Sequence, residues 1–186
     1  MRFEGFAGNA RAKKQLSSLF SSGRLPHALI LEGNEGTGRR TLAELIARAA
    51  VCTGEDKPCG ICAGCVKAAA GSHPDISKIS GTGAARSFHV DVIRSIRSDA
   101  YIKPNEANTK VYILAEADTM SEQAQNALLK ILEEPPERVL FILTCRSTTN
   151  LLPTVRSRAQ TVRVEEVSAQ EAADFAAQQL PDTPRE

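Results

Sequence analysis

Four of the five cysteines fall in one short segment of the chain, at Cys52, Cys59, Cys62 and Cys65. Their spacing, C-x6-C-x2-C-x2-C, lets four thiolates surround one Zn²⁺ ion tetrahedrally at about 2.3 Å each. Pro58 and Gly60 favour turns between the ligands. Because four protein ligands leave no open position for water, we expect a structural zinc site that pins a loop.

Other readings of these cysteines stay open at this point. A common iron–sulfur pattern is C-x2-C-x2-C-x3-C-P, whereas no cysteine follows Cys65 until Cys145. An iron–sulfur cluster, a redox pair and unligated thiols are the alternatives to zinc. Cys145 stands alone after an apolar run, so we expect it to be a core residue.

A second chemical pattern is the glycine-rich segment 33–41, GNEGTGRRT, which follows the apolar run HALIL at 27–31. The phosphate-binding P-loop has the pattern G-x-x-x-x-G-K-[ST], in which the glycines let the backbone approach phosphates. Gly33, Gly36 and Gly38 keep a glycine frame of this kind. A strand before it and a helical apolar pattern over 41–50 after it favour a P-loop over an ordinary turn.

The side chains of that loop differ from those of an active ATPase. Arg39 stands where the P-loop lysine would be, and a planar guanidinium is not equivalent to a compact ammonium. Arg40 replaces the hydroxyl that holds Mg²⁺. Thr41 comes one residue later, about 100° further round a helix, so we expect its hydroxyl to miss the metal.

The partner strand of an ATPase site should end in Asp-Glu, with the Asp organising Mg²⁺ and the Glu orienting water. Here the apolar run 111–114 is followed by Ala115 and Glu116, so the metal-organising carboxylate is missing. Three altered positions together predict a fold retained without its hydrolysis. Nucleotide binding itself stays open, since backbone amides at a helix N-terminus can hold phosphate.

Apolar runs alternate with helical patterns along the rest of the chain. Strands are expected at 27–31, 75–80, 111–114, 139–144 and 160–164, and helices over 41–50, 90–97 and 124–132. Capping boxes at 119–122 and 168–171 predict helix starts, and Pro135-Pro136 predicts a helix end. This alternation predicts an α/β fold with a parallel sheet covered on both faces. The last helix, from 168, reads as the beginning of a second domain.

Composition excludes some classes of nucleic-acid-binding protein. The net charge is +1, which argues against binding by bulk charge, and the absence of Trp with 4% aromatics argues against a base-stacking platform. We interpret the scattered cations as solvated surface; they are Lys13, Lys14, Arg86, Arg94, Arg97 and Lys103. No run approaches about 18 apolar residues, and the N-terminus lacks a secretory pattern, so we expect a cytoplasmic protein without a membrane span.

The glycine loop, the cysteines and three further segments, HVDVIR, SEQAQNALLKILEEPP and LLPTVRSRAQ, occur in one characteristic order. In this order the chain resembles the N-terminal AAA+ region of bacterial DNA polymerase III clamp-loader subunits. The altered P-loop favours the delta-prime type over the gamma/tau type. An active gamma/tau-like ATPase is the enzyme alternative, and a zinc-dependent redox or nucleic-acid module is a third class.

The resemblance implies an AAA+ base at 1–166, a zinc module at about 52–72 and the start of a helical lid at 167–186. It implies assembly with gamma/tau and delta subunits in the DNA polymerase III holoenzyme, and contact with sliding clamp and primer-template DNA through that complex. No independent ATPase activity is expected.

The resemblance also implies site residues. Arg158, in Ser157-Arg158, would be an arginine finger in a neighbour's ATP site, with Ala159 in place of the usual cysteine. Arg156 is close enough to be a rival. Thr144 matches the position that senses the terminal phosphate in active relatives, and in an inactive site we expect it to be a structural hydroxyl.

Overall fold

The core of the molecule is a five-stranded sheet with the order β2-β3-β4-β1-β5, in which every pairing is parallel. The computed structural model describes residues 1–81 and 88–179. The strands are β1 (Ala28–Glu32), β2 (Ile76–Ser80), β3 (Lys110–Ala115), β4 (Val139–Cys145) and β5 (Gln160–Arg163). The predicted parallel α/β sheet is therefore confirmed, with boundaries within two residues of the expected ones.

The inner strands β1, β3 and β4 are mainly apolar because both faces of the sheet are covered. In β1, Ala28 and Ile30 face one apolar core, while Leu29 and Leu31 face the other. Side chains of a strand alternate between faces, so a continuous apolar run fills two cores at once. Cys145, at the end of β4, is fully buried in the first core, as expected.

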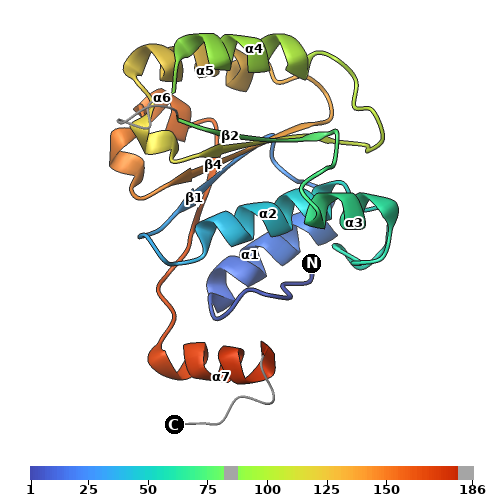
Figure 1. Ribbon diagram of the computed structural model, residues 1–186. Helices are drawn as coiled ribbons and strands as arrows, with labels where there is room; N and C mark the ends of the chain where they lie inside the picture. The colour runs from blue at the N-terminus through green and yellow to red at the C-terminus, as the bar shows by residue number, and fades with distance from the viewer. Residues whose placement is uncertain (82–87, 180–186) are drawn as a thin grey trace.

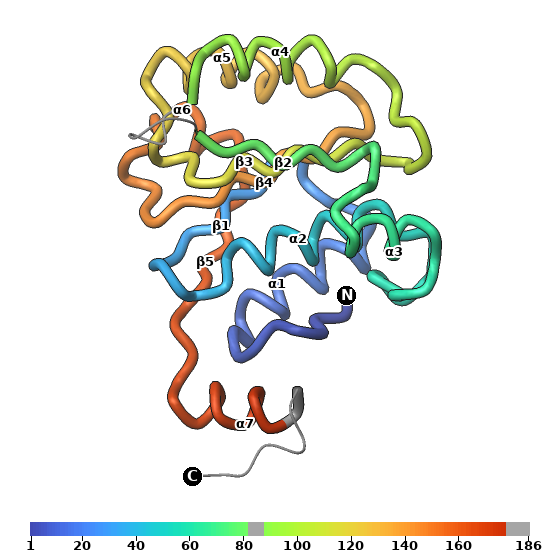
Figure 2. Tube along the Cα trace, in the orientation of Figure 1, coloured from blue at the N-terminus to red at the C-terminus, as the bar shows by residue number. Residues whose placement is uncertain are grey.

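Helices form a layer on each face of the sheet (Figure 1). One layer contains α4 (Val90–Ala100) and α5 (Glu122–Glu133), and the other contains α1 (Ala10–Ser21), α2 (Arg39–Ala50) and α3 (Ala63–Ala69). The short element η1 (Ala117–Thr119) leads from β3 to α5. The short elements η2 (Thr148–Asn150) and α6 (Pro153–Arg156) lie between β4 and β5. The tube view in Figure 2 shows the same three layers.

The apolar core on the α2 side of the sheet includes residues of α1, a helix that the sequence patterns did not predict. Ala12 and Leu16 of α1 are buried at a spacing of four residues, against the α2 side of the sheet. The helix α3 was also missed, because it lies within the cysteine segment. Between β4 and β5 the chain forms η2 and α6.

One predicted capping box is wrong. The cap of α5 is Ser121, whose hydroxyl accepts from the backbone N–H of Ala124. Thr119 instead ends η1 and donates from its hydroxyl to the carbonyl of Glu116. The short 3-10 turn ends at Thr119, two residues before the cap of the helix, which the linear pattern does not reveal.

The other predicted box is confirmed at α7 (Ala169–Gln179). The Glu171 carboxylate accepts from the Ser168 backbone N–H at 2.9 Å, and the Ser168 hydroxyl accepts from the Glu171 N–H at 3.2 Å. An extended segment connects β5 to α7, which lies beyond α1 (Figure 1). Within the described residues, no helix is long and apolar enough to cross a membrane.

Candidate functional site

The glycine loop between β1 and α2 has a P-loop-like backbone. Gly36 and Gly38 have φ angles of +87° and +83°, in the left-handed region that favours glycine. A Cβ on Gly33 would lie 2.4 Å from the Val164 carbonyl oxygen, so this position has no room for a side chain. The predicted glycine frame is therefore required by the local geometry, at the carboxyl end of β1.

Arg39, the first residue of α2, folds back onto this loop. Its guanidinium donates a hydrogen bond to the Gly33 carbonyl oxygen, and the residue is only 8% exposed. Arg40 and Thr41 are exposed on the helix surface. The cation that stands in the lysine position thus binds the loop itself, and neither following side chain lies in the buried loop.

The ends of β3 and β4 lie next to each other and are linked by a hydroxyl. The Glu116 backbone N–H donates to the Thr144 hydroxyl at 3.1 Å, and Thr144 is 1% exposed. Glu116 itself has a left-handed backbone, with φ 58°. The Thr144 hydroxyl therefore makes a structural hydrogen bond between the two strand ends.

The space beside these strand ends is small. A pocket of about 70 Å³ is lined by Arg40, Glu44, Lys78, Ala115 and Thr144, among others, whereas small-molecule sites enclose about 300–1,000 Å³. The Lys78 ammonium and the Glu44 carboxylate form an ion pair at 2.7 Å beside it.

A larger depression of about 460 Å³ lies on the other side of the loop. Its lining includes the acidic residues Glu32, Glu165 and Glu166 as well as Arg146 and Arg163. Carboxylates repel a triphosphate. Among the described residues, this depression is therefore of mixed charge rather than a purely cationic cradle for phosphate.

The four clustered cysteines converge on one point. Their Sγ atoms all lie within 4.8 Å of one another, and the Sγ atoms of Cys52 and Cys62 are 3.9 Å apart. Tetrahedral zinc with bonds of 2.3 Å needs sulfur atoms about 3.8 Å apart. An iron–sulfur cluster holds its thiolates further apart, because several iron atoms lie between them. The donor set therefore fits a single metal ion such as zinc.

Backbone N–H groups around the cysteines favour thiolates. The N–H groups of Gly54 and Cys59 donate to Cys52 Sγ at 3.3 Å each, and Cys65 N–H donates to Cys62 Sγ at 3.4 Å. The Thr53 backbone N–H lowers the pKa of Cys62 to about 5. Burial raises the pKa of Cys65 to about 12. A bound metal ion would offset this cost, since metals deprotonate their thiol ligands.

Close packing joins this cysteine cluster to the end of α2. A Cβ on Gly64 would lie 2.6 Å from the Val51 carbonyl oxygen, so α3 rests directly on the chain that leaves α2. The helix α2 has 12 residues and is therefore about 18 Å long. The cysteines lie beyond its far end from the glycine loop, which fits a structural role.

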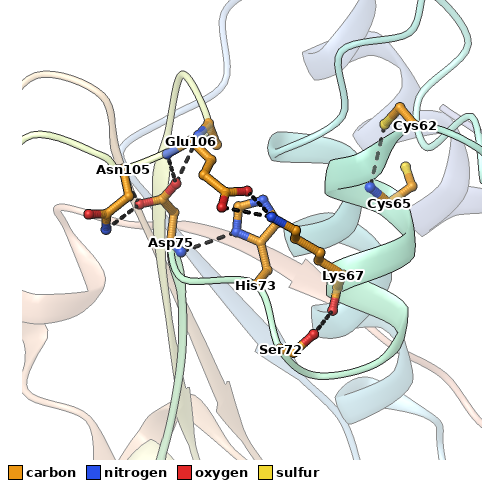
Figure 3. Close-up of polar contacts among 9 residues, drawn as sticks. Cys62, Cys65, Lys67, Ser72, His73, Asp75, Asn105 and Glu106 are labelled. Atoms are coloured by element: carbon orange, nitrogen blue, oxygen red, sulfur yellow. Dashed lines mark hydrogen bonds and ion pairs between the residues drawn. The ribbon is translucent and has the colours of Figure 1, made fainter.

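Sequence reasoning missed the residue that anchors the neighbouring loop. Asp75 is fully buried, and its carboxylate accepts from the backbone N–H groups of Asn105, Glu106 and Ala107 at 2.6, 2.8 and 2.8 Å (Figure 3). The Asn105 side-chain amide adds a fourth bond at 3.1 Å. Burial raises the Asp75 pKa, but these donors outweigh it and hold the pKa below its usual value.

The same network reaches α3. The Asp75 N–H donates to His73 Nδ1 at 3.1 Å, and the Glu106 carboxylate pairs with the Lys67 ammonium of α3 at 2.6 Å (Figure 3). These contacts therefore connect α3 and the start of β2 to the loop before β3. The linear sequence gives one weak signal for this, an aspartate directly before a strand.

The chain places Arg158 away from its own glycine loop. It precedes β5 by two residues, and β5 begins with Gln160 opposite Leu29, near the amino end of β1. The glycine loop follows Glu32, at the other end of β1. Arg158 therefore lies at the level of the strands' amino ends.

The Arg158 guanidinium is held by neighbouring groups. Its Nη2 forms an ion pair with Glu133 at 2.9 Å, and its Nη1 donates to the Thr154 carbonyl and the Ser157 hydroxyl at 3.0 and 3.3 Å. The side chain is 34% exposed. Arg156, the rival candidate, is exposed at the end of α6.

The scattered cations are divided between the two faces of the sheet. Lys13 and Lys14 are on α1, with the Lys13 ammonium 5.6 Å from the centre of the Phe6 ring, whereas Arg94 and Arg97 are on α4. Lys103 is exposed after α4. Arg86 lies outside the described residues. These positions agree with a solvated surface rather than one patch.

The chain is similar in sequence to subunits of DNA polymerase III over most of its length. It is 36% identical over 171 residues to DNA polymerase III subunit tau of Bacillus subtilis, covering 91% of this chain and 30% of the relative. It is also 36% identical over 147 residues to subunit delta' of Yersinia pestis, covering 78% of this chain and 43% of the relative. The chain thus spans less than half the length of these relatives.

A solved structure of a DNA polymerase III gamma subunit-related protein from Thermotoga maritima matches with a TM-score of 0.61 and 23% identity, over 90% of this chain and 51% of that one. The RuvB Holliday junction branch migration motor of the same organism matches with a TM-score of 0.62 and 15% identity, over 94% and 51%. These likenesses show the AAA+ P-loop-type fold.

The family model described as "DNA polymerase III, delta subunit" matches residues 8–168. The chain therefore belongs to the DNA polymerase III delta subunit family of clamp-loader proteins, and its described part has the fold of their N-terminal AAA+ region.

Proposed function

We propose that this chain is the N-terminal part of a non-hydrolysing, delta-prime-type clamp-loader subunit. In this role it supports ATP-dependent loading of the sliding clamp and supplies Arg158 as an arginine finger to a neighbouring ATPase subunit. The observation that carries the proposal is the contact of Arg39 with the Gly33 carbonyl. The side chain that would bind phosphate in an ATPase is used here within the loop.

The loss of hydrolysis follows from three positions. Arg39 is engaged with the loop, Arg40 brings no hydroxyl for Mg²⁺, and Ala115 offers no carboxylate to the metal. The small pocket beside Ala115 supports the same conclusion. Gly33, Gly36 and Gly38 are then a structural remnant that shapes the start of α2, with Glu116 and Thr144 linking two strand ends.

A finger role for Arg158 requires action in a second subunit. The register of β5 supports this, because Arg158 is near the strands' amino ends and its own glycine loop is at their carboxyl ends. An arginine that reaches a transferring phosphoryl group stabilises the charge of the transition state, typically by about 10³ to 10⁵ in rate.

Zinc is the metal that we propose for the cysteine cluster. Cys52, Cys59, Cys62 and Cys65 would hold it, and the closed thiolate set would supply a crosslink rather than catalysis. The crosslink fixes the loop after α2 against α3. The module at about 52–72, the base at 1–166 and a lid that begins at 167 are the domain boundaries that go with this role.

The proposed partners are gamma/tau and delta subunits, with sliding clamp and primer-template DNA reached through the complex. A cytoplasmic location goes with replication. The active alternative, a gamma/tau-like ATPase, is favoured by one observation, the 36% identity with subunit tau over 91% of the chain.

Nucleotide binding by the isolated full-length protein distinguishes these two functions. Mg²⁺-ATP is titrated calorimetrically into the protein, and ATP turnover is followed on the same sample, with the gamma/tau subunit as the matched positive control. We expect neither saturation at micromolar ATP nor turnover. Saturable binding with turnover by this protein alone would instead establish the active ATPase.

A further inference from the structure

The acidic motif that ends α5 has no role in the function described so far. Glu133 is the last residue of this helix and the first acidic residue of the segment ILEEPP. Its Oε1 lies 2.9 Å from Nη2 of Arg158, 25 positions further along the chain. The motif thus contacts the proposed arginine finger.

Three acceptors hold the Arg158 guanidinium in one orientation. Glu133 binds Nη2, while the Thr154 carbonyl and the Ser157 hydroxyl bind Nη1 at 3.0 and 3.3 Å. A guanidinium has five N–H donors. The three contacts leave two donors, at Nε and at Nη2, for an acceptor from another molecule.

A fixed orientation matters for a finger, because an arginine side chain otherwise populates many rotamers. Donors that are already oriented stabilise developing charge more effectively than donors that must reorganise during the reaction. Two of the three acceptors, Thr154 and Ser157, are neutral, so they orient the guanidinium without cancelling its charge. Within residues 1–81 and 88–179, Glu133 is the acceptor that restrains the Nη2 side.

We propose that Glu133 is a positioning residue for Arg158, which holds the guanidinium ready for the phosphate of a neighbouring subunit. This inference rests on the proposed function, since it assigns a partner to the finger. The ion pair is partly exposed, with side-chain exposures of 34% for Arg158 and 49% for Glu133. Its energy in water is therefore small, and the two remaining donors of the guanidinium stay available to the phosphate while Glu133 holds it.

The experiment measures steady-state ATP hydrolysis by the assembled clamp loader, built with the full-length protein. Arg158→Ala should lower kcat about 10³-fold. Glu133→Ala should lower kcat about fivefold, because loss of a partly exposed ion pair lowers the population of the oriented Arg158 side chain by about that factor. The KM for ATP should not change. Glu133→Gln keeps an acceptor oxygen and should stay within about twofold of wild type.

Two further variants separate positioning from a general structural effect. The double variant Glu133→Ala/Arg158→Ala should be no slower than Arg158→Ala, because Glu133 acts only through Arg158. The matched control is Glu134→Ala, since the Glu134 carboxylate makes no ion pair within residues 1–81 and 88–179.

Each alternative result overturns a definite statement. A Glu133→Ala complex as fast as wild type or faster refutes positioning, as does a double variant that is a further fivefold slower than Arg158→Ala. Unchanged hydrolysis in Arg158→Ala refutes the finger itself, and with it the proposed function. Thermal unfolding of each variant identifies any loss of rate that comes from misfolding.

Discussion

Replacing Asp75 by asparagine should destabilise the fold strongly, although the change removes no volume. The carboxylate is fully buried and accepts hydrogen bonds from three backbone N–H groups and one side-chain amide. Asparagine has one acceptor oxygen, and its NH₂ group would face N–H donors that then have no partner. An unsatisfied buried donor costs about 1–3 kcal/mol.

The variant loses two charge-assisted hydrogen bonds, and the easier burial of a neutral amide offsets part of that loss. The free energy of unfolding should therefore fall by about 3 kcal/mol. Chemical denaturation by urea, followed by circular dichroism at pH 7, measures this difference in the free energy of unfolding. Asp91→Asn is the matched control, because that side chain is 82% exposed, and it should change stability by less than about 0.5 kcal/mol.

The pH dependence tests the same reasoning. Because the pKa of Asp75 is lowered in the folded protein, its stabilisation is complete above the unfolded pKa of about 3.9. It is lost as the pH falls through the lower folded value. The difference between wild type and Asp75→Asn should therefore shrink below about pH 4. A variant as stable as wild type at pH 7, or a difference unaltered by acid, would refute this account.

Three more predictions concern other parts of the chain. Elemental analysis of gently purified protein should find about one zinc per chain, whereas metal-free protein with the same fold would exclude the structural site. Tyr112→Phe should cost about 1–2 kcal/mol, because the Tyr112 hydroxyl donates to the Asp99 carboxylate; urea unfolding equal to wild type would contradict this. Arg39→Ala should lower stability by about 1 kcal/mol and leave hydrolysis by the assembled complex unchanged; a clear fall in hydrolysis would give Arg39 a catalytic role.

The sheet could be predicted from the sequence because neighbouring apolar residues along the chain mark its buried strands. The inner strands of the sheet are nearly unbroken apolar runs, such as residues 139–144, and a run of that kind needs cover on both faces. The cysteine cluster was predictable for the same reason, because a metal fixes the spacing of its ligands. The helix α1 was missed, since Lys13, Lys14 and Gln15 interrupt its apolar positions and its cover comes from distant strands.

Contacts between distant segments could not be read from spacing. Nothing near Asp75 indicates that residues 105–107 fold onto its carboxylate. The contact of Glu133 with Arg158 depends in the same way on how α5 and α6 pack. At Thr119 the linear pattern was misleading, because the 3-10 turn moved the helix cap to Ser121.

The central claim is that Arg158 acts in the ATP site of a neighbouring subunit. Single-turnover ATP hydrolysis by the assembled clamp loader tests it most directly, with wild type, Arg158→Ala and Arg156→Ala compared at saturating ATP. The account predicts a fall of about 10³-fold for Arg158→Ala, with assembly and ATP binding intact and Arg156→Ala close to wild type. Hydrolysis at the wild-type rate in Arg158→Ala, or the large fall in Arg156→Ala instead, would contradict it.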